Sequence, residues 1–274
     1  MAIPEGVAAP RRVPELVARL RSGGPALVAL SGGVDSAVVA ALAREALGHE
    51  VLAATVASSA VSARELEAAR EVARQLGLRY RVVEAEPLER EGYRANGGDR
   101  CYHCRTVEAG SLVRLGGSYG IVQYLDGLHL DDLGDDRPGV RAMDEAGFSH
   151  PLLWARWRKD DVRSYARSAG LGNWDRPSNA CLASRVARGE PVSRDLLARI
   201  ERAEALVLDR GFRRVRVRVR AGEARVEVGA GEVARLETEP LRTELTRGLV
   251  GLGFARVTID PVGYRERSEL PVLR

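Results

Sequence analysis

Residues 26–47 of the chain, ALVALSGGVDSAVVAALAREAL, place a short apolar run before a helical segment, with a turn rich in glycine and serine between them. ALVAL at 26–30 has the length and composition of a buried strand. The helical segment begins at Val34, carries its apolar residues on one stripe, and ends before Gly48, where glycine is favoured as a helix terminator. The stretch therefore predicts a strand, a tight turn and a helix.

The alternation of strand and helix continues along the chain. Apolar runs at 50–57 and 79–85 flank a helical segment at 63–77, and a fourth strand is expected at 121–127. Short apolar strands bounded by turn residues are typical of a parallel sheet that is covered by helices on both faces. The sequence therefore predicts an α/β fold.

The pattern changes near residue 190. Ser193 is placed to cap a new helix, and two strands are predicted at 215–220, where VRVRVR alternates strictly, and at 223–228. We therefore expect a large domain at 1–189 and a small α+β domain at 190–274.

The composition is that of a soluble globular protein. Of 274 residues, 45% are hydrophobic and 29% are charged, and no apolar run reaches the roughly 18 residues that suggest a membrane span. The first residues lack the apolar core of a secretory signal, so a cytoplasmic location and no membrane association are expected.

The charge pattern gives little support to nucleic-acid binding. The net charge is +4, but the 42 basic residues are spread along the chain among 38 acidic ones. Aromatic residues, which would stack on bases, make up 5%. Lys159 is the single lysine, and we attribute that skew to coding composition rather than to function.

The turn between the first strand and its helix is a candidate phosphate-binding loop. Glycines allow close approach of a phosphate to the backbone, the helix start favours anions, and the serine hydroxyls add donors. No lysine follows the glycines, so this is not a Walker loop, and it is not GxGxxG either. The bland alternative is a Gly-Gly turn with an Asp at the positive end of the helix dipole. The candidate ATP-binding residues are Ser31, Gly32, Gly33, Asp35 and Ser36.

The spacing of this loop resembles the SGGxDS signature of the PP-loop ATP pyrophosphatases, enzymes with an adenine nucleotide alpha hydrolase-like fold. The resemblance implies that the loop holds the pyrophosphate end of ATP, and that Asp35 helps to organise Mg²⁺. Ser58 ends the second predicted strand, next to the first, where such proteins bind adenosine.

The three cysteines form a second candidate site. Cys101 and Cys104 make a CxxC pair, and Cys181 lies far along the chain. An odd number of cysteines without an export signal favours metal, cluster or thiol chemistry over disulfides. A zinc site completed by His103 or His129, a pair of unreactive buried thiols, and chance are the alternatives. A cluster with three cysteine ligands would leave one iron open to carry a sulfide.

Several blocks together resemble the sacrificial sulfur transferases called LarE, which help to make the nickel-pincer nucleotide cofactor of lactate racemase. The resemblance runs almost end to end. The blocks that carry it lie at 31–36, 96–104, 126–142, 177–185, 215–228 and 260–265.

The resemblance implies a reaction. The carboxylates of pyridinium-3,5-dicarboxylate mononucleotide are adenylated by ATP, and sulfur then displaces AMP to leave thiocarboxylates. In single-cysteine members the cysteine that matches Cys181 attacks and is consumed. With Cys101 and Cys104 also present, the chain is similar to members whose three cysteines hold a four-iron four-sulfur cluster that carries the donated sulfide. The family also implies a homo-oligomer such as a hexamer.

The resemblance adds further site residues. Gly127 joins the ATP site, and Cys181 and Asp35 become the catalytic residues. Period two places Arg216 and Arg218 on one face of their strand, which without the resemblance would be interpreted as a solvated face. The residues implied for the substrate's phosphate and carboxylates are Ser184, Arg185, Arg216, Arg218, Glu227 and Arg265.

The chain departs from the family pattern at two positions. His129 stands where the family commonly has Asn, and Gly97 where Pro is usual. Three rival functions remain: a tRNA thiolase with a PP-loop and a cluster, an ammonia-using amide synthetase, and a noncatalytic nucleotide-binding module. The amide synthetase would not explain the cysteines.

Overall fold

The computed structural model describes residues 12–133 and 138–264. This part of the chain divides into two compact units, of which the first contains residues up to 93 and 98–179, and the second contains 94–97 and residues from 180 onward. The boundary expected from the sequence lay between 189 and 190. None of the described helices is long and apolar enough to cross a membrane.

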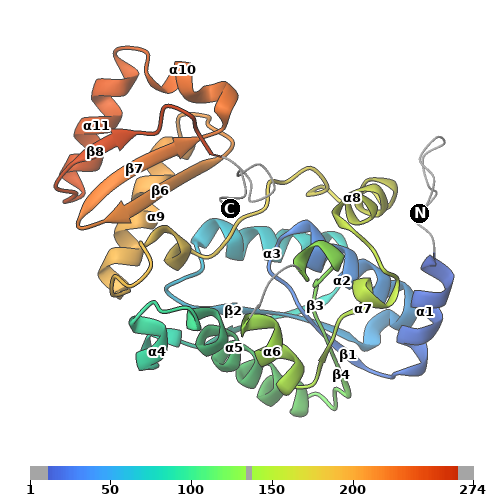
Figure 1. The fold of residues 1–274 in the computed structure, drawn as a ribbon. Coiled ribbons are helices and arrows are strands. Elements are labelled where there is room, and N and C mark those ends of the chain that lie inside the picture. Colours follow the sequence, from blue (N-terminus) through green and yellow to red (C-terminus); the bar gives the residue numbers. More distant parts are fainter. Residues whose placement is uncertain (1–11, 134–137, 265–274) are drawn as a thin grey trace. The chain divides into compact units, whose positions relative to one another are not determined.

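The first unit is built on a five-stranded sheet in which every neighbouring pair is parallel (Figure 1). The strand order is β3-β2-β1-β4-β5. This confirms the predicted PP-loop type of α/β fold. The strands are β1 (Ala26–Ala29), β2 (Val51–Ala57), β3 (Arg79–Glu84), β4 (Gln123–Leu125) and β5 (Phe148–Ser149).

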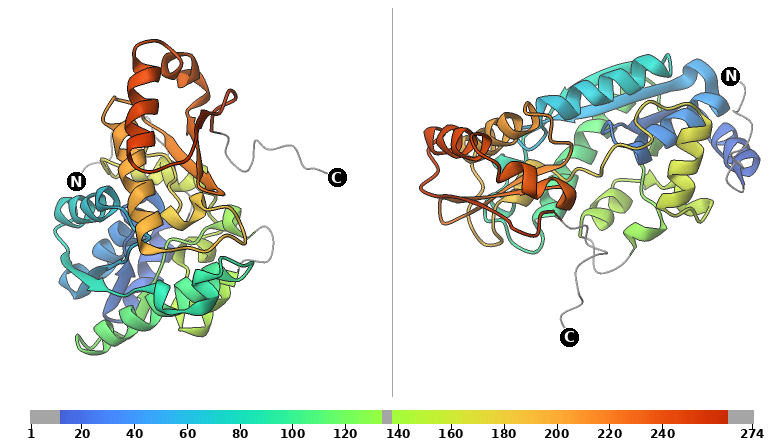
Figure 2. Two further views of the ribbon diagram at one scale, coloured as in Figure 1. Left: turned by 90° about the vertical axis from the view of Figure 1, so that its left-hand side faces the viewer. Right: turned by 90° about the horizontal axis from the view of Figure 1, so that it is seen from above.

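Helices cover both faces of this sheet (Figure 2). Alternate side chains of β1 divide between two apolar clusters: Ala26 and Val28 join one, and Leu27 joins the other. The first cluster is covered by α1 (Val13–Ser22), α2 (Val34–Leu47), α3 (Ala63–Gln75), α7 (Pro151–Trp154) and α8 (Lys159–Ser168). The second is covered by α5 (Arg100–Gly117) and α6 (Pro138–Glu145), and the short α4 spans Glu91–Arg94.

The second unit is a small mixed sheet with helices. Strand β6 pairs antiparallel with β7, and β7 pairs parallel with β8. Ser193 caps the first helix, because its Oγ accepts a hydrogen bond from the backbone N–H of Leu196 at 3.2 Å. The elements are α9 (Arg194–Leu208), β6 (Val215–Arg220), β7 (Glu223–Val228), α10 (Val233–Leu236), α11 (Leu241–Gly251) and β8 (Val257–Ile259).

Candidate functional site

The predicted phosphate loop lies between β1 and α2 and needs glycine at its centre. Gly32 has φ of 77°, a conformation that side chains with a Cβ rarely adopt. A Cβ there would also lie 2.7 Å from the backbone nitrogen of Ala69 on α3. The loop therefore runs against α3 with no room for a side chain.

Two serines brace the loop from inside. The buried Ser36 Oγ lies 3.1 Å from the backbone nitrogen of Ser31 and 3.1 Å from Ser31 Oγ, and it donates to the carbonyl of Gly33 at 3.1 Å. The N-cap residue of α2 is Gly33, which offers no side-chain cap. The first-turn N–H groups are thus left for an anion, as a phosphate site requires.

The structure brings Gly127 and Ser58 to the same edge of the sheet. Gly127 follows β4, and a Cβ on it would lie 2.6 Å from the backbone nitrogen of Ser36. Ser58 follows β2, where its Oγ accepts from the N–H of Ala60 at 3.3 Å. Because β1 lies between β2 and β4, the chain passes to opposite sides of the sheet here, at the kind of switch point where α/β proteins bind ligands.

Charged side chains surround Asp35 at the start of α2. Its two carboxylate oxygens accept from the Lys159 ammonium at 2.6 and 2.7 Å. The Nε2 atom of His129 lies 3.6 Å from Asp35 and 3.4 Å from Asp132. The Lys159 backbone N–H donates to Asp131 at 2.8 Å, and this bond is the main reason that the pKa of Asp131 is lowered. Asp35 is therefore held by a cation while the loop has no phosphate.

Two further side chains bind the loop backbone. Asn173 Nδ2 and Arg176 Nη1 donate to the carbonyl of Gly32 at 3.1 and 3.2 Å. Arg176 adds a second cation beside the phosphate loop, from the segment that follows α8.

The CxxC pair lies in the first two turns of α5. Cys101 is exposed, whereas Cys104 is buried and its Sγ donates to Glu108 Oε1 at 3.4 Å. Spacing by three residues places the two thiols on one side of the helix, as a shared metal or cluster edge requires. Within the described ranges, no group of three or more His, Cys, Asp and Glu residues is arranged to hold a metal ion.

Cys181 belongs to the second unit and begins a loop that Arg185 fixes. The Arg185 guanidinium is fully buried and donates to the carbonyl of Cys181 at 3.0 Å and to that of Ala180. Its other side donates to both carboxylate oxygens of Glu204 on α9, at 2.7 and 3.0 Å. The same carboxylate accepts from the N–H of Val217 at 3.0 Å, so the pair ties the cysteine loop to α9 and β6.

The predicted anion-binding arginines of β6 have different environments. Arg216 is buried, and burial together with the nearby charge of Arg185 lowers its pKa. Arg218 is half-buried and donates to Glu227 at 3.1 Å and to the carbonyl of Ser184 at 3.0 Å. Arg265 lies outside the described residues.

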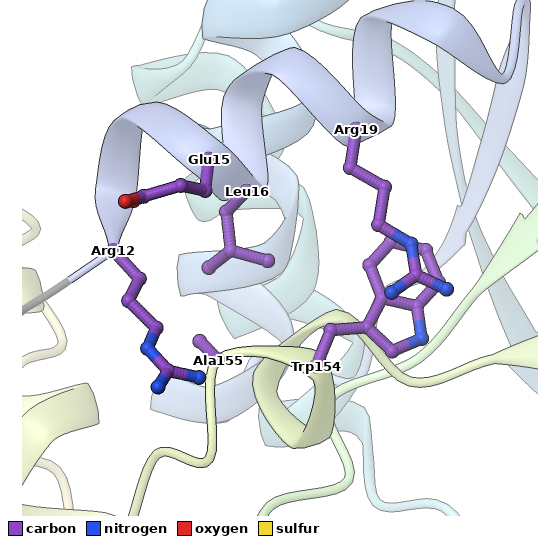
Figure 3. Close-up of a pocket in the computed structure, with 6 residues that line it drawn as sticks. All are labelled: Arg12, Glu15, Leu16, Arg19, Trp154 and Ala155. Atoms are coloured by element: carbon purple, nitrogen blue, oxygen red, sulfur yellow. The ribbon is translucent and has the colours of Figure 1, made fainter.

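A separate pocket lies between α1 and α7 (Figure 3). The Arg19 guanidinium stacks 3.8 Å from the Trp154 ring centroid at its edge. None of the predicted site residues lines it, so we assign it no part in the phosphate site.

The comparisons with known proteins agree with the phosphate loop. The sequence model of the asparagine synthase family matches residues 13–92, which include the loop. An uncharacterized protein of Synechocystis is 35% identical over 88% of this chain and 90% of its own length. The pyridinium-3,5-bisthiocarboxylic acid mononucleotide synthase of Lactiplantibacillus plantarum is 32% identical over 91% of this chain and 90% of its own length.

The chain belongs to the LarE family. It is accordingly an enzyme of the PP-loop ATP pyrophosphatase type. A more distant match, 29% identical over 57% of this chain, is the tRNA-specific 2-thiouridylase of Rhodospirillum rubrum, of which it covers 52%.

Sequence reasoning missed Lys159 as a site residue, although a signal was present. In this LarE-family chain arginine fills every other basic position apart from the histidines. The one retained lysine pairs with Asp35, where a compact ammonium with three donors fits and a planar guanidinium differs in shape. An isolated exception to a compositional bias therefore marked a functional position.

Lys159→Met tests this assignment. Hydrogen bonds from charged groups contribute about 1.5–3 kcal/mol, so we expect affinity for Mg²⁺-ATP to fall about 10- to 100-fold, and Lys159→Arg to lose less. Titration calorimetry measures both. The control is Arg158→Met, whose side chain is 68% exposed on Asp131, and it should change affinity by less than about fivefold. Unaltered binding by Lys159→Met would contradict the assignment.

Glu204→Ala tests the support of the cysteine loop. It leaves the Arg185 guanidinium buried without its carboxylate, so we expect the free energy of unfolding in urea to fall by about 3–5 kcal/mol. Glu244→Ala removes an exposed partner of Arg210, with side chains 48% and 41% exposed, and serves as the control. That control should cost no more than about 1 kcal/mol. Equal effects of the two variants would show that the buried pair has no special role.

Proposed function

We propose that this chain adenylates the carboxylates of pyridinium-3,5-dicarboxylate mononucleotide and converts them to thiocarboxylates for the nickel-pincer cofactor. The observation that supports it most is the phosphate loop, with Asp35 and Lys159 at its edge, in a chain 32% identical to the bisthiocarboxylic acid mononucleotide synthase over nearly its whole length.

The reaction has two steps for each carboxylate. A carboxylate oxygen attacks the α-phosphorus of ATP, the bond to pyrophosphate breaks, and an acyl adenylate forms. A sulfur nucleophile then attacks the acyl carbon, AMP leaves, and a thiocarboxylate remains. AMP is a far better leaving group than hydroxide, which is why ATP is needed.

The residues of the first unit fit the first step. The N–H groups at the start of α2 and the Ser31 hydroxyl bind the pyrophosphate end of ATP. Asp35 would hold Mg²⁺, since carboxylate oxygens suit that ion, and Lys159 would then be free to pair with a phosphate instead. Gly127 and Ser58 border the nucleotide from the neighbouring strands.

The residues of the second unit fit the second step. Cys181 is the reactive thiol, and Ser184 and Arg218 lie in its immediate hydrogen-bond network. Arg218, Arg216 and the more distant Arg265 supply guanidinium groups for the substrate's phosphate and carboxylates. Arg185 serves the site by fixing the Cys181 loop, because its own donors are taken by Glu204 and backbone carbonyls.

The source of sulfur is the finer part of the proposal. Cys101 and Cys104, one helical turn apart, suit one edge of a four-iron four-sulfur cluster, and Cys181 would be the third ligand. Such a cluster supplies a sulfide at its open iron, so that no protein cysteine is consumed. Cys101 is exposed, which leaves that edge accessible for assembly.

Pyrophosphate release tests the substrate. We expect release that depends on pyridinium-3,5-dicarboxylate mononucleotide, and Cys181→Ala should retain it while losing at least 99% of thiocarboxylate formation, a loss of about 100-fold or more. A coupled pyrophosphate assay and mass spectrometry of the product measure the two steps. Release stimulated by tRNA in place of the dicarboxylate nucleotide would favour a thiolase, to which the Rhodospirillum match gives distant support.

Iron analysis tests the sulfur source. Protein purified without oxygen should carry about four irons with acid-labile sulfide per chain, and a Cys101→Ala, Cys104→Ala double variant should lose them. Chelation of the iron should then stop repeated turnover. Protein without iron whose mass falls by one sulfur after reaction would instead show that Cys181 is sacrificed.

A further inference from the structure

His150 bridges two carboxylates beside the phosphate site. It lies between β5 and α7, with Nδ1 2.7 Å from Asp126 Oδ1 and Nε2 2.7 Å from Asp144 Oδ1. Its side chain is 11% exposed. None of the functional roles assigned above uses this histidine.

The two contacts define its protonation. An ionised carboxylate only accepts hydrogen bonds, so both ring nitrogens must donate and the ring is an imidazolium. Burial alone would lower the pKa of His150, but hydrogen bonds and charges from Asp126 and Asp144 outweigh burial and raise it to about 9. These two aspartates, from the end of β4 and from α6, are the charged groups that act on it.

Asp126 connects His150 to the ATP site. The same Oδ1 atom accepts from the N–H of Leu128 at 3.1 Å, and the Asp126 N–H donates to the carbonyl of Ser149 at 3.2 Å. These bonds fold the turn whose middle residue is Gly127. Since a Cβ on Gly127 would lie 2.6 Å from Ser36 N, the turn abuts the N–H groups expected to bind phosphate.

We propose that His150 is a positioning residue of the ATP site, which holds the turn at 126–128 against the start of α2 and so sets the affinity for ATP. The proposal rests on the proposed use of ATP at this loop and not on the identity of the sulfur acceptor. Its chemistry is a buried cation that clamps a turn between two strand ends.

The clamp has a defined pH dependence. A histidine whose pKa is raised by folding contributes its stabilisation fully below its ordinary value of 6.5, and the contribution is lost as pH rises through about 9. ATP affinity should therefore fall above neutral pH as the imidazolium loses its proton.

The test measures binding of Mg²⁺ with a nonhydrolysable ATP analogue by calorimetry on the full chain from pH 7 to 10. Loss of a charge-assisted hydrogen bond should weaken wild-type affinity about tenfold across this range. His150→Gln should be weaker by a similar factor at pH 7 and should show little further change with pH.

Asp144→Asn is the matched second variant, because it keeps the shape and removes one charge from a side chain that is 57% exposed. Its affinity should fall at a lower pH than that of the wild type. NMR titration of the imidazole should show the same downward shift of the His150 pKa. A histidine that only stabilises the fold would change the melting temperature and leave the pH profile of binding unaltered.

Two results would overturn the proposal: wild-type affinity in His150→Gln at pH 7, or a pH-dependent fall that persists in that variant. Thermal melting of each variant separates unfolding from weak binding, and Asp144→Asn still decides the question if His150→Gln does not fold. A wild-type chain that shows the expected binding profile, but does not use the dicarboxylate nucleotide, would contradict the proposed substrate and still support the role of His150.

Discussion

The start of α2 can form a phosphate site because two backbone segments meet it without side chains in between. Gly32 lies against α3, and Gly127 lies against the first turn of α2 at distances that exclude a Cβ. Three elements thus converge on one helical turn, and the N–H groups there face a space bounded by backbone rather than by mobile side chains. A larger residue at either position would separate these elements before it affected any hydrogen bond.

Both units treat buried charge in the same manner. Asp35 is neutralised by Lys159, His150 by two aspartates, and Arg185 by Glu204. Each pair costs desolvation and gains little net stability, but each fixes the orientation of a loop. In this enzyme the ion pairs lie next to the loops assigned to chemistry, so their main effect is on geometry.

Much of the fold could be predicted from local pattern. The strand at β1, the phosphate loop, the helices α2 and α9 and the VRVRVR strand each follow from periodicity and capping, and all lie where they were expected. The helix α5 around the CxxC pair was not foreseen, because its sequence has glycines and polar residues throughout and no clear apolar stripe. The region at 126–185 was expected to be mainly loops, but α6 and α7 form there through packing on the sheet.

The candidate site was predictable only where residue type alone indicates chemistry. The glycines, serines and cysteines were found in this way, whereas the partners of Asp35 and Asp126 lie 124 and 24 residues away along the chain. Contacts over such separations are created by folding. Burial also altered one assignment in kind: Arg185 has the right chemistry for an anion, but its donors are already used within the unit.

The solitary lysine gives the chain an unusual chemical simplicity. Its only side-chain primary amine lies at the edge of the nucleotide site, 22% exposed and bonded to Asp35. Acylation of side-chain amines, whether by a reagent or by a reactive acyl adenylate that escapes transfer, has one target in this protein. Occupancy of the site and protection of that amine would therefore be the same event, and the enzyme carries its own single-point reporter of nucleotide binding.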